Sequence, residues 1–153
     1  MITINEQQIK IINGLIEATV DSADGYHEAA KDARNPVFKT MFETRSTRRK
    51  QLATGLQAEV RALGGKPADD GTILAATHRI FLNLKNLVTG DDESVIAEIE
   101  AGEDYIKAKF ERALQEEGLV GSVHAVVAKA YQSVKADHDQ MSALKHGLER
   151  HAA

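Results

Sequence analysis

Long segments with hydrophobic residues at helical spacing constrain the fold of this chain more than any other feature of its sequence. In the first of these segments the hydrophobic residues recur every three or four positions, at Ile9, Ile12, Ile16, Ala23, Tyr26 and Ala30. This spacing is typical of one face of an amphipathic helix, and no segment shows the strict alternation of a strand. Similar stripes recur along the rest of the chain, so the pattern predicts an all-α protein.

Proline and glycine mark the expected helix ends. Asn35-Pro36 is typical of an N-cap followed by proline at the first helical position, and Gly64-Gly65 is typical of a helix end. The 153 residues are expected to form one domain over 1–153, since a chain of this length usually makes a single compact unit. The predicted helices cover about 5–34, 36–63, 72–88, 92–117 and 122–148.

The helix lengths suggest how the helices are connected. At 1.5 Å per residue four of them are roughly 40 Å long, whereas the 72–88 helix is only about 25 Å long. Four matched helices form a bundle, and a short helix lying lengthwise between the second and third long helices returns the chain to the other end. This is the long crossover of a ferritin-like four-helix bundle. The alternative is a single long, kinked helix over 72–117.

Composition excludes several classes of function. The chain has no cysteine, which excludes disulfides, thiolate catalysis and cysteine-based metal sites. The 19 basic residues against 23 acidic ones give a net charge of -4, which does not suit a nucleic-acid-binding surface. No apolar run approaches the ~20 residues that span a bilayer, and the N-terminus lacks the features of a signal peptide. A cytoplasmic location without nucleic-acid or membrane partners is therefore expected.

Charged residues fall on the inner stripes of three helices. The spacing places Arg45, together with Arg48 or Arg49, inward on the second helix, Glu103 inward on the fourth and Asp137 inward on the fifth. Because a buried unpaired charge is costly, these residues should meet in the middle of the bundle. One interpretation is a functional layer that holds a metal or an anion. The favoured one is a structural arginine–carboxylate network, in which the arginines neutralise the two carboxylates.

A ferritin-type metal centre makes a stricter demand on the sequence. It takes Glu-x-x-His from each of two helices, and this chain contains no such motif. We therefore expect no metal or other cofactor and no catalytic residues. If a divalent metal does bind, the candidate ligands are Asp24, His27, Glu103 and His138.

Ordered motifs connect the chain with a known group. Those of the first half are Leu15-Ile16-Glu17, Asp21, Gly25-Tyr26, Ala29-Ala30, Leu56-Gln57-Ala58-Glu59-Val60 and Leu63-Gly64-Gly65-Lys66-Pro67. Those of the second half are His78-Arg79, Leu84-Lys85, Thr89-Gly90-Asp91-Asp92, Glu98-Ile99-Glu100, Gly102-Glu103-Asp104, Val134 and His138-Asp139. From about Ile4 to Leu148 the chain resembles bacterial ferritin-like four-helix-bundle proteins whose domain has no known function. The resemblance implies a ferritin-like fold with a crossover and implies no activity. The chain departs from the group's pattern at Gly55 and Ala130.

These observations favour a non-enzymatic binding protein. Its role would be structural or, by analogy with other ferritin-like proteins, related to stress. Self-association as a homodimer or another homo-oligomer is expected, because the 72–88 helix carries more apolar residues than one groove covers, namely Leu74, Phe81, Leu82 and Val88. The alternative is a metal-binding or oxidoreductase protein with an incomplete carboxylate and histidine site. The sequence does not identify the ligand.

Overall fold

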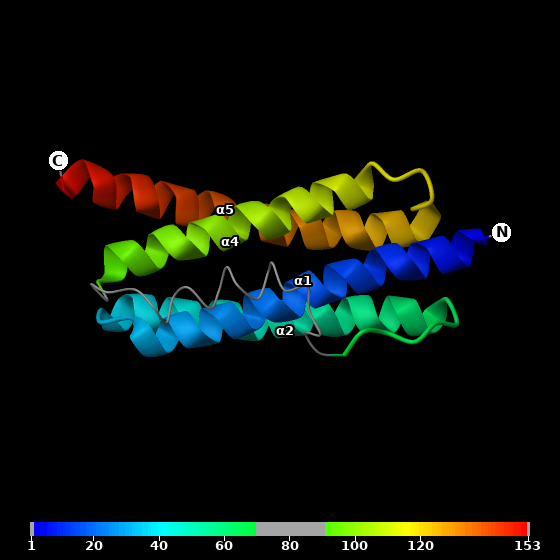
Figure 1. Ribbon diagram of the computed structural model, residues 1–153, viewed down its shortest axis with the longest axis horizontal. Helices are drawn as coiled ribbons and strands as arrows, with labels where there is room; N and C mark the ends of the chain where they lie inside the picture. Colours follow the sequence, from blue (N-terminus) through cyan, green and yellow to red (C-terminus); the bar gives the residue numbers. More distant parts are fainter. Residues whose placement is uncertain (1, 70–90, 153) are drawn as a thin grey trace.

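Four long α-helices make up the part of the chain that the computed structural model describes, residues 2–69 and 91–152 (Figure 1). They are α1 (Ile4–Asp32), α2 (Pro36–Ala62), α4 (Asp92–Leu114) and α5 (Gly121–Ala152). These residues contain no strand, which confirms the all-α prediction for them. The helix predicted at 72–88, with the apolar residues that suggested self-association, lies outside the described residues. Among the described helices, none combines the length and hydrophobicity needed to cross a membrane.

Helix ends are set by local side-chain chemistry. Thr3 caps α1 in a capping box with Glu6, and the Asn35 side chain accepts a hydrogen bond from the Val37 amide at the start of α2. Gly64 adopts the positive φ of 84° that ends α2, as the glycine pair predicts. The predicted ends at 34 and 117 are slightly too late, because the extended backbone that leads into Pro36 ends α1 at Asp32 and the α4–α5 turn starts after Leu114.

The helices pack as two antiparallel pairs, α1 with α2 and α4 with α5, and α1 also lies against α4 (Figure 1). The carboxylate of Asp92, at the start of α4, accepts hydrogen bonds from the Arg34 and Asn35 amides at 2.8 and 3.0 Å. The Asn13 side chain of α1 contacts the backbone of Lys66 and Ala68, beyond the end of α2. Helices α2 and α4 therefore run in the same direction, and the end of α2 and the start of α4 lie at opposite ends of the bundle.

The core consists of two apolar clusters placed at different heights in the bundle. One is built around Ile12, Ile16, Leu56, Ile106, Phe110 and Val127. The other is built around Tyr26, Phe42, Ile96, Ile99 and Met141. On each helix the two clusters are separated by a short interval, and these four intervals hold the buried polar residues from which the candidate site is built.

Candidate functional site

Two buried arginines of α2 form the centre of the candidate site. Arg45 and Arg49 are four residues apart, so both lie on the helix face that points into the bundle. They are 2% and 1% exposed, although arginine is among the residues least often buried without a partner. The third arginine, Arg48, lies on the neighbouring face and its side chain is 49% exposed. Of the two alternatives for the inward position beside Arg45, the structure therefore places Arg49 there.

Arg49 connects three other helices through its guanidinium group. Its Nη1 donates to Ser22 Oγ of α1 at 2.5 Å, and its Nη2 donates to Glu103 Oε2 of α4 at 2.8 Å. The same Nη2 lies 3.4 Å from Asp137 Oδ2 of α5. Glu103 is fully buried, so this is a desolvated ion pair. Burial alone lowers the pKa of Arg49, but Glu103 outweighs that effect and raises it, so the guanidinium stays charged.

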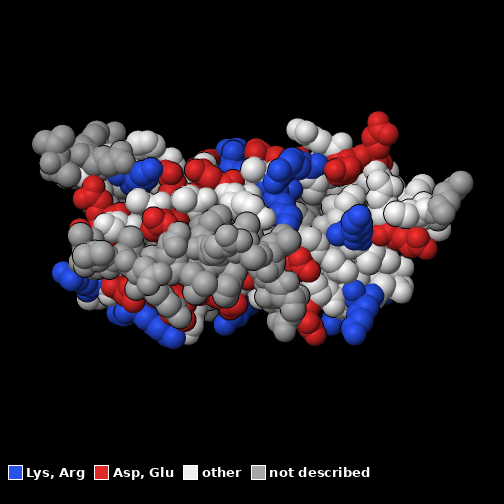
Figure 2. Space-filling model, viewed as in Figure 1, with Lys and Arg blue, Asp and Glu red and all other residues white. Residues whose placement is uncertain are grey.

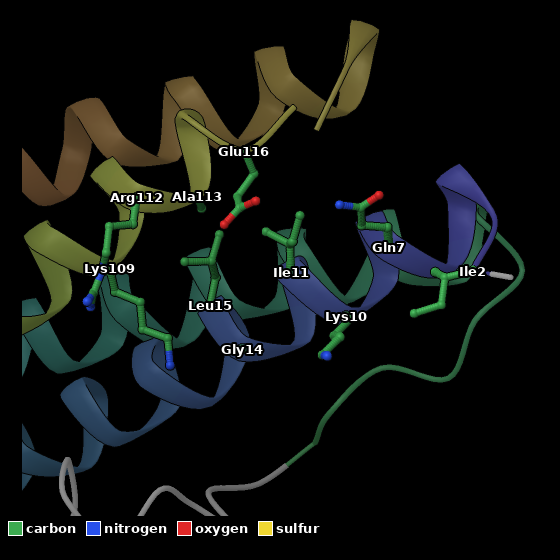
Figure 3. Close-up of a pocket in the computed structure, with 10 residues that line it drawn as sticks. All are labelled: Ile2, Gln7, Lys10, Ile11, Gly14, Leu15, Lys109, Arg112, Ala113 and Glu116. Carbon is green, nitrogen blue, oxygen red and sulfur yellow. The ribbon is translucent and has the colours of Figure 1, made fainter. Parts of the chain in front are cut away.

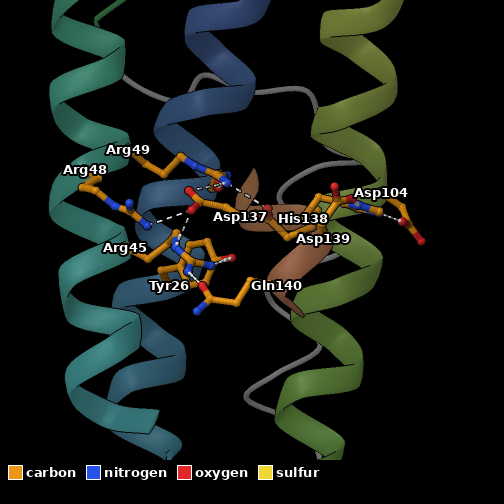
Figure 4. Close-up of polar contacts among 11 residues, drawn as sticks. Tyr26, Arg45, Arg48, Arg49, Asp104, Asp137, His138, Asp139 and Gln140 are labelled. Carbon is orange, nitrogen blue, oxygen red and sulfur yellow. Dashed lines mark hydrogen bonds and ion pairs between the residues drawn. The ribbon is translucent and has the colours of Figure 1, made fainter. Parts of the chain in front are cut away.

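Asp137 is the carboxylate that all three arginines share (Figure 4). Its Oδ1 lies 2.7 Å from Arg48 Nη2 and 3.3 Å from Arg45 Nε, while its Oδ2 faces Arg49. Arg48 reaches this carboxylate from the surface, as a long side chain with an exposed stem can do. Asp137 is 4% exposed, so these three arginines, rather than water, compensate its negative charge.

Tyr26 of α1 supports both buried arginines. The guanidinium carbons of Arg45 and Arg49 each lie 5.5 Å from the centre of its ring, within the range of cation–π attraction. Arg45 Nη1 also donates to the Tyr26 hydroxyl at 3.2 Å, and Arg45 Nη2 donates to Gln140 Oε1 of α5. Burial raises the pKa of Tyr26 above its usual range, so the phenol is neutral.

The five charged residues carry a net positive charge. Arg45, Arg48 and Arg49 contribute three positive charges and Glu103 and Asp137 two negative ones, a balance of +1. Such a centre repels a metal cation, because both carboxylates already face guanidinium groups. Within the described residues, no three histidine, aspartate or glutamate side chains converge in a way that could hold a metal ion.

The candidate metal ligands lie apart from one another. Asp24 and His27 are exposed on α1, whereas Glu103 is buried against Arg49. His138 is half-buried and faces Asp104 of α4, with its Nε2 2.6 Å from the carboxylate, while its Nδ1 lies 3.1 Å from Asp139 (Figure 4). Partial burial lowers the pKa of His138, but the hydrogen bonds to the two aspartates prevail and raise it. The structure thus places His138 in a surface ion pair between α4 and α5.

Some polar groups of the centre were missed by sequence reasoning. Ser22, the Tyr26 hydroxyl and Gln140 accept hydrogen bonds from the arginines, whereas the sequence pattern places Tyr26 only among the apolar residues of its stripe. The inward position of Ser22 could be predicted from the sequence, because Ser22 precedes Tyr26 by four residues and so lies on the same inner face of α1.

A buried aspartate of α1 was also missed as a polar feature of the core. Asp21 is 4% exposed, and its Oδ2 has no hydrogen-bond partner among the described residues. Burial, together with the charges of Asp24 and Glu17, raises the pKa of Asp21 to about 7. This carboxyl group therefore titrates near neutral pH.

Comparison with known proteins identifies the family of the chain and no more. The sequence profile of a family described as a domain of unknown function (DUF2383) matches residues 7–116. Because the match covers more than half of the 153 residues, the chain belongs to this family. The match includes most of α1 and all of α2 and α4. It contains four of the five charged residues, namely Arg45, Arg48, Arg49 and Glu103, and ends before Asp137. No curated protein matches the chain.

Proposed function

We propose that this chain is a non-enzymatic, ferritin-like bundle protein of the bacterial cytoplasm, with a structural or stress-related binding role. The observation that carries this proposal is the arginine–carboxylate network at the bundle centre. Ferritin-type proteins use that position for inward-facing carboxylate and histidine ligands. Here Arg45 and Arg49 lie there, and Glu103 and Asp137 serve as their counter-ions.

The helix directions support the ferritin-like part of the proposal. Helices α2 and α4 run in the same direction in two antiparallel pairs, so the end of α2 and the start of α4 lie at opposite ends of the bundle (Figure 1). Ferritin-like folds have one long crossover of this kind, whereas simple up-and-down bundles have only short loops. A short helix over 72–88 within that connection remains part of the proposal.

Self-association is the second part of the proposal. Ile2 and Ile4 are 63% and 61% exposed at the start of α1, and Val120 is 48% exposed in the α4–α5 turn. Its amide donates to Gln8 Oε1 of α1, which places these apolar side chains at the same end of the bundle. An apolar end of this kind favours contact with a second copy. We propose a homodimer or another homo-oligomer.

Nucleic acid and membranes are not proposed as partners. Figure 2 shows acidic and basic side chains mixed over the described part of one face, and the net charge of the whole chain is -4. A nucleic-acid-binding protein would instead gather basic residues into a patch or a stripe.

Metal analysis tests the proposed absence of metal chemistry. The protein is purified without chelators, its metals are determined by elemental analysis, and Fe²⁺ is then added in air while oxidation is followed by absorbance. We expect no stoichiometric metal, and iron oxidation no faster than in buffer. Stoichiometric binding with rapid oxidation would favour the alternative, a metal-binding or oxidoreductase protein that uses Asp24, His27, Glu103 and His138.

Light scattering coupled to size exclusion tests self-association. We expect a mass of at least twice 16.7 kDa. The double variant Ile2→Ser/Ile4→Ser should weaken the assembly, while Lys50→Gln, an exposed change on α2, should leave it unchanged. A wild-type protein that stays monomeric at high concentration contradicts this part of the proposal.

A further inference from the structure

A groove between α1 and α4 lies apart from the arginine network, toward the end of the bundle where α1 begins (Figure 3). It has a volume of about 600 Å³, which is in the range of small-molecule sites. Its apolar wall is formed by Ile11 and Leu15 of α1 and Ala113 of α4. The α1 residues that line the groove, from Gln7 to Leu15, extend for roughly 12 Å along the helix axis, at 1.5 Å per residue.

Three basic residues also line the groove. Lys109 and Arg112 extend from α4 toward α1, and Lys10 lies on the α1 side (Figure 3). Among the described residues, no carboxylate lies within ion-pairing distance of any of the three, although most charged side chains near the bundle centre are paired. The groove therefore has cationic groups that are available to an anion.

Gly14 leaves open the space beneath one of these cations. It lies in the middle of α1, where glycine is less favourable than alanine. A Cβ atom built there would lie 3.7 Å from Lys109 Cε, an ordinary contact, so packing against Lys109 does not require glycine. The Lys109 ammonium also lies 5.9 Å from the centre of the Tyr105 ring, which helps to position it.

The acidic residue Glu116 gives the groove a direction. It lies in the α4–α5 turn, just beyond the end of α4, and its carboxylate projects into the groove near Ile11 and Leu15 (Figure 3). An anionic head group is repelled from the Glu116 end and attracted to Lys109 and Arg112. An apolar tail is then directed along Ile11 toward the start of α1.

We propose that this groove binds a single-chain acyl carboxylate of medium length, with the carboxylate at Lys109 and Arg112 and the chain along Ile11 and Ala113. A guanidinium and an ammonium group together suit a carboxylate head, which accepts charge-assisted hydrogen bonds. The apolar wall suits an alkyl chain, whose transfer from water is favourable. The site shares no residue with the arginine network, so a failure of decanoate binding would leave the account of the bundle centre unchanged.

Binding is tested with the full-length protein and decanoate, by calorimetry and by two-dimensional amide NMR. We expect one saturable site, with the largest shift changes in α1 around Gly14 and in α4 around Lys109. Decanol lacks the charge, decyltrimethylammonium has the opposite charge and acetate lacks the chain. Each should bind at least about tenfold more weakly, because each loses the charge-assisted bonds or the apolar contact.

Variants separate this groove from non-specific binding. Lys109→Gln/Arg112→Gln and Gly14→Leu should each raise the Kd for decanoate at least about tenfold, the first by removing charge and the second by filling the groove. Lys50→Gln removes a charge elsewhere and should change the Kd less than about twofold. Circular dichroism verifies that each variant folds, and all the changed side chains are exposed or half-buried.

Several outcomes would overturn the inference. They are equal affinity for decanoate and decanol, no effect of either groove variant, shifts that map away from α1 and α4, or no saturable binding of decanoate at all. Binding only to vesicles that contain phosphatidylglycerol, and not to free decanoate, would assign the basic residues to a lipid surface instead.

Discussion

The ion pair between Arg49 and Glu103 gives the most direct test of the polar centre. The substitution Glu103→Gln keeps the size of the side chain and an oxygen that can accept a hydrogen bond from Arg49. It removes only the negative charge that lies 2.8 Å from Arg49 Nη2. The charge balance of the five residues then rises from +1 to +2, with both buried arginines dependent on Asp137.

The structure sets the size of the expected effect. Removing one partner of a buried ion pair costs about 3–5 kcal/mol, because the other charge stays buried without compensation. Asp137 Oδ2 lies 3.4 Å from Arg49 Nη2 and provides part of that compensation, so we expect a loss near the lower end of this range. For a domain of this size, a loss of about 3 kcal/mol corresponds to a Tm lower by roughly 6–12 °C.

Urea denaturation followed by circular dichroism measures the change in the free energy of unfolding. The matched control is Arg48→Gln, which removes a charge from the same cluster at a side chain that is 49% exposed. The control should cost no more than about 1 kcal/mol, because Arg48 is half exposed and Arg45 and Arg49 still face Asp137 when it is removed. If Glu103→Gln costs as little as the control, the charge of Glu103 does not stabilise Arg49 and our account of the centre is wrong.

Three further predictions concern separate sites. Asp21→Asn should stabilise the protein by about 2–4 kcal/mol at pH 8 and by nothing near pH 4. The reason is that the pKa of Asp21 rises from 3.8 to about 7 on folding, so the wild type loses stability as pH increases between those values. Urea denaturation at both pH values measures this difference. Asp104→Asn should lower the pKa of His138, because the Asp104 carboxylate lies 2.6 Å from His138 Nε2 and stabilises the imidazolium. An NMR titration of the imidazole measures the change. Gly55→Ala should stabilise α2 by about 0.5–1 kcal/mol, because a Cβ there meets nothing within 4 Å, and thermal denaturation measures it.

Helix positions and inner faces could be predicted because they depend on local periodicity. The stripe of α2 passes through Phe42, Leu56 and Val60, and it indicates that the polar residues between them lie at the core. Arg48 and Arg49 are adjacent, however, and differ by only about 100° around the helix. Which of them lies inward depends on how α2 rotates against α1 and α5, and the sequence of one helix does not specify that rotation.

Features that depend on the contact between helices could not be predicted. The α1–α4 groove is lined by Gly14 of α1 and Ala113 of α4, two small residues that come together only when the helices pack. Each residue alone is unremarkable in its own stripe. The burial of Asp21 is similar, since it lies beside Ser22 on α1 and its environment is decided by neighbouring elements.

Arg49 occupies the place that a cation would need, and its replacement tests this interpretation of the centre. Arg49→Glu changes the balance of the five residues from +1 to -1 and directs a third carboxylate toward Glu103 and Asp137. Carboxylate groups suit Mn²⁺, so added Mn²⁺ should restore part of the stability that the variant loses, by about 2.7 kcal/mol at a hundredfold excess over the Kd. Arg49→Gln removes the guanidinium without adding a carboxylate, and it should gain nothing from Mn²⁺.

Thermal denaturation with Mn²⁺ and with a chelator compares the wild type, Arg49→Glu and Arg49→Gln. If the wild type gains as much from Mn²⁺ as Arg49→Glu does, the arginine does not exclude a cation from the centre, and the argument against metal binding there fails.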